Sequence, residues 1–138
     1  MSEIPQKVLS INFQNSSRMT LIVQSASLSA GDWGSGPADQ PCIGDMIESG
    51  DGRKYKTVTN FVSGLIGQIQ LITTGSGTLT LVWQWQAQGS LIFNAFVQNT
   101  SDIDVSKSVS GDNTTKTAFV TAINASPFVA LVFMDQES

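Results

Sequence analysis

Three basic residues around one aromatic ring form the most distinctive cluster of chemically useful side chains. Arg53, Lys54 and Lys56 surround Tyr55, so three of the seven lysines and arginines of the chain fall within four residues. Cations bind phosphate headgroups, and Trp and Tyr rings prefer the boundary between membrane and water. The cluster therefore favours a lipid-headgroup site, although the start of a solvated strand gives the same pattern.

The tryptophans add a second candidate feature. Leu79, Leu81, Trp83 and Trp85 share one parity, and the positions between them are mostly polar. Successive side chains of a strand point to opposite faces, so this pattern predicts a strand whose leucines and Trp83 lie in the core. Trp85 is nearer the strand end; if exposed, it forms with Trp33 an aromatic platform that enters lipid or stacks on a sugar. The predicted binding residues are Trp33, Arg53, Lys54, Tyr55, Lys56 and Trp85.

The sequence offers few side chains of the kinds that catalyse reactions. The chain has no histidine and one cysteine, Cys42, which excludes a Cys-His pair, a Ser-His-Asp triad, a histidine metal site and an intramolecular disulfide. Asp32, Asp39 and Asp45 match no calcium-loop spacing, and loop aspartates more often accept backbone hydrogen bonds in turns. We therefore expect no enzyme, no catalytic residue, no metal and no cofactor.

Length and charge set further limits. The 138 residues are one domain's worth of chain, so we expect a single domain over residues 1–138. Only 13% of the residues are charged and the net charge is −4, which disfavours nucleic acid as a partner because phosphate neutralisation needs clustered Lys and Arg. The N-terminus shows no signal-peptide pattern, so we expect synthesis in the cytoplasm, followed by release and action at a target membrane.

Short alternating segments separated by turn residues predict β-structure. Residues 65–73 and 78–88 flank a Thr-Gly-Ser-Gly turn and predict a hairpin. Residues 8–13 and 19–23 flank an Asn-Ser-Ser turn and predict an opening hairpin. Residues 29–45, rich in Gly, Pro and Asp, predict a long loop.

The second half of the chain continues this pattern. Residues 91–98 are apolar on both parities and predict a strand buried on both faces. Residues 100–115 predict a polar loop with at most a short strand near Val105, and residues 117–123 and 128–134 predict a terminal hairpin. No segment shows helical spacing with caps, so we expect an all-β fold, a single-domain antiparallel β-sandwich of about seven to nine strands.

The order of several features resembles the aegerolysin family over most of the chain. The opening strand carries Ile11-Asn12-Phe13-x-Asn15, and Val82-Trp83-Gln84-Trp85 lies in the tryptophan strand. The family's proline after that strand is missing here. The other matching positions are Gly31, Asp32, Trp33, Pro37, Pro41, Ile43, Gly44, Ser49, Gly64, Gly67, Gly89 and Asn94.

The resemblance implies a small acidic β-sandwich that binds a membrane lipid headgroup, often of a sphingolipid. It also implies a larger pore-forming protein partner with a membrane-attack-complex/perforin domain, so that the chain is the binding component of a two-part toxin. Two other hypotheses stay open: a lectin-like module that stacks its aromatic rings on sugars, and a structural protein that assembles as a homo-oligomer.

Overall fold

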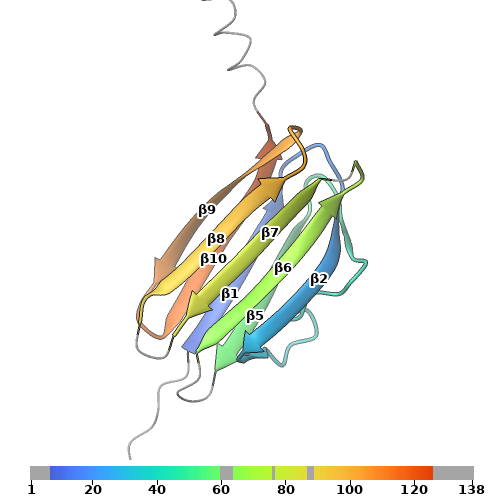
Figure 1. The fold of residues 1–138 in the computed structure, drawn as a ribbon. Helices are drawn as coiled ribbons and strands as arrows, with labels where there is room; N and C mark the ends of the chain where they lie inside the picture. The colour runs from blue at the N-terminus through green and yellow to red at the C-terminus, as the bar shows by residue number, and fades with distance from the viewer. Residues whose placement is uncertain (1–6, 60–63, 76, 87–88, 126–138) are drawn as a thin grey trace, which may run out of the picture.

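The computed structural model describes residues 7–59, 64–75, 77–86 and 89–125, which form ten strands in two facing sheets and no helix (Figure 1). Sheet A has the order β3-β5-β1-β10-β9 and sheet B the order β4-β2-β6-β7-β8. The all-β sandwich is thereby confirmed. The strands are β1 (Lys7–Asn15), β2 (Leu21–Ala30), β3 (Asp32–Trp33), β4 (Met46–Ile47), β5 (Gly52–Thr59), β6 (Leu65–Thr73), β7 (Thr78–Trp85), β8 (Leu91–Gln98), β9 (Ile103–Gly111) and β10 (Thr115–Asn124).

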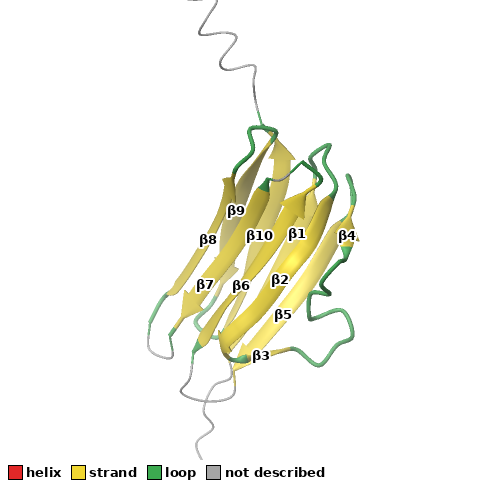
Figure 2. Ribbon diagram, turned by 45° about the vertical axis from the view of Figure 1, so that its right-hand side comes forward, coloured by secondary structure: helices red, strands yellow, loops and turns green. Residues whose placement is uncertain are grey.

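One pair of strands departs from the predicted antiparallel arrangement. β1 and β10 lie side by side at the centre of sheet A and run parallel, with Val8 opposite Thr115 and Asn15 opposite Ala122. The other described pairs are antiparallel. The strands nearest the two ends of the described chain therefore meet in the middle of one sheet (Figure 2).

The predicted hairpin in the middle of the chain is confirmed, and the opening one is wrong. β6 and β7 pair in register, with Leu65 opposite Trp85 and Ile72 opposite Thr78. β1 and β2, by contrast, belong to different sheets, because the turn after β1 carries the chain from sheet A to sheet B. The buried Asn15 amide fixes this crossing by donating hydrogen bonds to the carbonyls of Met19 and Ile47 at 2.8 and 2.9 Å.

The core lies between the inward-facing residues of the two sheets. Leu9, Ile11 and Phe13 of β1 face Leu79, Leu81 and Trp83 of β7 in one buried cluster. Gly67 lies opposite Trp83, and a Cβ there would come within 2.6 Å of the indole Cζ2 and 2.5 Å of Leu28 Cδ2. The missing side chain therefore makes room for the Trp83 ring, as its predicted core position requires.

Two predictions about the second half of the chain are wrong. β8 belongs to a two-layer sandwich in which each sheet buries only its inner face, so Ile92 and Phe96 on its outward side are exposed and the strand is not buried on both faces. Residues 103–111 form the full strand β9 where a loop was expected, because they pair along their length with β10. The predicted strand over residues 128–134 lies outside the described residues.

Candidate functional site

The basic cluster on β5 is divided between the two faces of its strand. Tyr55 and Thr57 are buried against the core, whereas Lys54 and Lys56 point away from it and are exposed. Alternation along a strand makes this division unavoidable, since neighbouring side chains leave it in opposite directions. The four consecutive residues therefore cannot act as one site.

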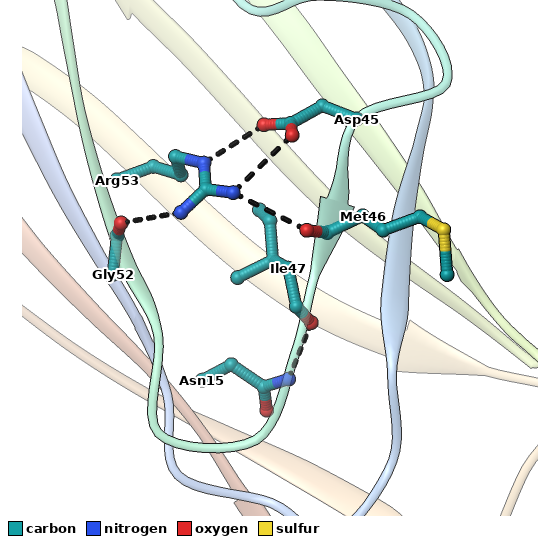
Figure 3. A network of polar contacts seen from close by, with 6 residues as sticks. All are labelled: Asn15, Asp45, Met46, Ile47, Gly52 and Arg53. Carbon is teal, nitrogen blue, oxygen red and sulfur yellow. Dashed lines mark hydrogen bonds and ion pairs between the residues drawn. The ribbon is translucent and has the colours of Figure 1, made fainter.

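Arg53 is held by a neighbouring carboxylate and two carbonyls (Figure 3). Its Nε and Nη2 donate to the two carboxylate oxygens of Asp45 at 2.8 and 3.2 Å, and further bonds reach the carbonyls of Gly52 and Met46 at 2.9 and 3.2 Å. The hydrogen bonds to Asp45 raise the pKa of the guanidinium against the opposing effect of burial. A ligand at Arg53 would have to compete with Asp45, so this side chain mainly ties β5 to the segment before it.

Two of the predicted aromatic contacts are enclosed by the fold. Tyr55 is 4% exposed and Trp85 is 1% exposed, so neither ring offers a surface to a ligand in the folded chain. The side chain of Lys7 covers Trp85, with its Nζ 4.6 Å from the ring centroid, and Lys116 Nζ lies at 5.7 Å. Burial raises the pKa of Tyr55 to about 12.

Trp33 closes a margin of the core and is half-buried. It pairs with Thr57 of β5 and meets Trp83 edge-on, with ring centroids 6.3 Å apart at 75°. Trp83 in turn stacks on Phe93 at 6.2 Å and 9°. The predicted platform of Trp33 and Trp85 is not formed, because Trp85 is enclosed and Trp33 packs against the core.

The outer face of sheet A keeps the two exposed cations and adds an aromatic ring. Lys54 pairs with Asn12, and Asn12 pairs on its other side with Phe119, which is 43% exposed. Two strand spacings of about 4.8 Å separate Lys54 from Phe119, so their Cα atoms lie about 10 Å apart. Phe119 was missed in the sequence, although it shares a parity with the polar Thr117 and Thr121.

A groove of about 520 Å³ runs between these side chains. Gly52 occupies an outward position beside Gln14, and its missing side chain leaves the groove open there. Within the described ranges the one ion pair joins Arg53 to Asp45, so no described carboxylate lies within 4 Å of the Lys54 or Lys56 ammonium groups. The residues that line this sheet A groove with outward-pointing side chains are Asn12, Gln14, Lys54, Phe119 and Thr121; Phe13, Gly52, Arg53 and Val120 complete the lining.

The sheet A groove combines an ammonium group, two carboxamides, a hydroxyl and an aromatic ring. Such a set can bind an anionic or hydroxylated headgroup while the ring contacts its apolar neighbour. Over the described part of the chain, no three His, Cys, Asp or Glu side chains are placed to hold a metal ion. None of the described residues form a helix that could cross a bilayer.

The fold places the chain in the class of small two-sheet β-sandwiches, and several solved proteins share it. The described architecture is similar to IP-1A from Alcaligenes faecalis, at 19% identity over 86% of this chain and 91% of that chain, with a TM-score of 0.67. It is also similar to the lipid binding protein Nakanori, at 13% identity over 91% of this chain and 72% of that chain, with a TM-score of 0.65. The Xerocomus chrysenteron lectin XCL is 9% identical over 85% of this chain and 99% of the lectin, with a TM-score of 0.56.

At these identities the likeness establishes the fold alone. No protein-family model matches the chain, and no curated protein matches it in sequence.

Proposed function

We propose that the protein binds membrane lipids through the outer face of sheet A. The observation that carries this proposal is the placement of Lys54 and the exposed Phe119 in the sheet A groove, with Lys56 exposed on the same face. The shared fold with a lipid binding protein supports it.

The chemistry of this face suits the surface of a membrane. A lysine near an anionic bilayer surface contributes about 1 kcal/mol, and a partly buried ring adds apolar area at the same depth. The carboxamides of Asn12 and Gln14 and the Thr121 hydroxyl supply hydrogen bonds for the polar part of a headgroup.

The aegerolysin resemblance extends the proposal to a particular ligand and partner. The headgroup belongs to a sphingolipid, and the bound protein recruits a larger pore-forming protein as the second component of a toxin. Neither step follows from the groove, and each has its own measurement: retention on sphingolipid vesicles, and lysis of those vesicles when a perforin-type protein is added.

Sedimentation with liposomes tests the binding face. Lys54→Gln with Lys56→Gln removes two ammonium groups and keeps side-chain length, and about 1 kcal/mol for each lysine predicts a roughly 30-fold lower partition coefficient on vesicles with anionic headgroups. Phe119→Ser should also weaken retention. Arg18→Gln is the control for loss of a single cation elsewhere, because it removes one from a different depression beside Asp102.

Two outcomes would contradict the proposal. The first is no retention of the natural chain on phosphatidylcholine, phosphatidylserine or sphingolipid vesicles. The second is equal retention of the natural chain and the double lysine variant.

The lectin reading is the second candidate for the same groove. Carboxamides, a hydroxyl and an exposed ring are also what a sugar needs, and a lectin shares the fold. Glycan-array binding that survives loss of both lysines but fails in Phe119→Ser would favour a sugar ligand.

A further inference from the structure

Sheet B differs from sheet A in its charge. None of the residues in β2, β4, β6, β7 and β8 is Asp, Glu, Lys or Arg. The strands of sheet A, by contrast, contain five lysines, one arginine and two aspartates. The inner face of sheet B is core, so the missing charge is a property of its outer face, which a soluble chain normally covers with charged residues.

The outer face of sheet B also carries exposed apolar side chains. Ile92 is 66% exposed, Met46 52% and Phe96 36%. A groove of about 490 Å³ crosses the face between Ile92 and the serines of β2, with Ile66 and Val82 in its lining. The central part of a protein–protein interface is typically depleted of charged residues and enriched in residues such as Phe and Met.

The polar groups on this face suit contact with an identical surface. They are carboxamides and hydroxyls, each of which both donates and accepts a hydrogen bond. In a two-fold interface residue i of one copy meets residue j of the other and the reverse, so groups with both capacities can pair with themselves. The carboxamides on the face include Gln68, Gln70, Gln84, Asn94 and Gln98.

Charge favours a second copy of this chain as the occupant. The protein carries a net charge of −4, so two copies repel each other over most orientations. The outer face of sheet B is the described sheet face on which two copies meet without opposing like charges. At the margins of this face, Lys107 binds the Phe93 carbonyl of β8 and Arg53 binds Asp45 before β4.

The area of this face reaches the lower limit for a specific protein contact. Four strands about 4.8 Å apart, with eight residues rising about 3.3 Å each, give a face of roughly 19 by 26 Å, or about 500 Å² before side-chain relief. Two such faces bury about 1,000 Å² in total, which is the lower limit for a specific protein interface.

We propose that the protein forms a two-fold symmetric dimer in which the outer faces of two B sheets pack against each other. Because the two sheets of each sandwich face each other, the two A faces of this dimer point in opposite directions. If the proposed function holds, one dimer binds two membranes and bridges vesicles; this consequence rests on lipid binding, whereas the dimer itself does not.

Sedimentation equilibrium without lipid tests the dimer. Gln68→Glu with Gln84→Glu places two negative charges on exposed positions of the central strands β6 and β7. The matched control, Ser106→Glu with Ser108→Glu, adds the same charge to exposed positions of β9 on the outer face of sheet A. Like charges opposed across an interface should raise the dimer dissociation constant of the first variant at least about 100-fold and leave the control within a few-fold of the natural chain.

The outcomes separate the two proposals. The dimer proposal is contradicted if the natural chain stays monomeric up to millimolar concentration. It is also contradicted if the sheet B variant dimerises as the natural chain does. If that monomer needs the uncharged face for vesicle retention, the face meets lipid and the dimer is again overturned. A dimer that is retained on no vesicle leaves this inference standing and contradicts the lipid proposal instead. Vesicle turbidity completes the test: the natural chain should aggregate vesicles, and the sheet B variant should bind them without aggregation.

Discussion

Tyr55 gives the sharpest residue-scale prediction, because it is the only tyrosine in the chain and its buried hydroxyl has no hydrogen-bond partner among the described residues. Its pKa is about 12 in the folded state, chiefly through burial, against about 10 when unfolded. The unfolded chain therefore loses its phenolic proton first as pH rises. The free energy of unfolding should fall by about 2–3 kcal/mol between pH 10 and pH 12 through this group, and be insensitive to it below pH 10.

Phenolate absorbance follows this single group directly, and Tyr55→Phe is its control. The variant should lose the part of the pH dependence that this group causes. At neutral pH it should be as stable as the natural chain or about 1 kcal/mol more stable, since it removes an unpaired buried hydroxyl. Denaturant unfolding that shows a loss of stability at neutral pH would mean that the hydroxyl has a partner.

The sequence-based prediction of the binding site failed where it treated consecutive residues of one strand as a single site. Alternation alone separates Tyr55 from Lys54 and Lys56, whichever face is buried. The composition of residues 53–56 suggested a patch, but only the pairing of β5 with β1 shows which parity meets the core. The exposed ring beside these lysines, Phe119, comes from a strand far along the chain, and no local pattern connects the two.

At the scale of elements, the ring contacts predict how the core responds to truncation. Trp33 on β3, Trp83 on β7 and Phe93 on β8 join three strands through edge-on and stacked contacts. Trp83→Ala should cost about 3–5 kcal/mol, as for other large core residues, whereas Trp33→Ala should cost about 1–2 kcal/mol because the ring is half-buried. Denaturant midpoints of the two variants measure the difference, and an equal loss would place Trp33 fully in the core.

The elements that the sequence predicted are those with strong local signals. The β6–β7 hairpin has alternation on both strands and a glycine turn between them. β9 has too few apolar residues to be recognised, and its pairing with β10 decides its conformation. β8 is apolar on both parities, which resembles a doubly buried strand; in the structure its outward residues belong to the uncharged face.

At the scale of the whole molecule, the division of charge between the sheets predicts two different responses to salt. The screening length falls from about 10 Å at 0.1 M to about 3 Å at 1 M, so vesicle retention through Lys54 and Lys56 should weaken as salt rises. Dimerisation through uncharged side chains should be unchanged or stronger. Sedimentation with and without vesicles over this range measures both, and a dimer that dissociates with salt would contradict the sheet B interface.

The two-layer architecture followed from the spacing of the strands, but its topology did not. The uncharged stretches of sheet B are visible in the sequence, yet only the order β4-β2-β6-β7-β8 gathers them into one surface. The lysines of β5 likewise become a surface feature through β1 and β10 beside them.

The parallel pairing of β1 with β10 also has a consequence for how the chain is made. Val8 cannot meet Thr115 until nearly all of the described chain has been synthesised. At a synthesis rate of roughly 5–20 residues per second, about 5 to 20 s pass between the synthesis of β1 and the synthesis of β10. During that time Leu9, Ile11 and Phe13 lack half of their sheet, so the nascent chain is most open to aggregation and to chaperones before β10 emerges.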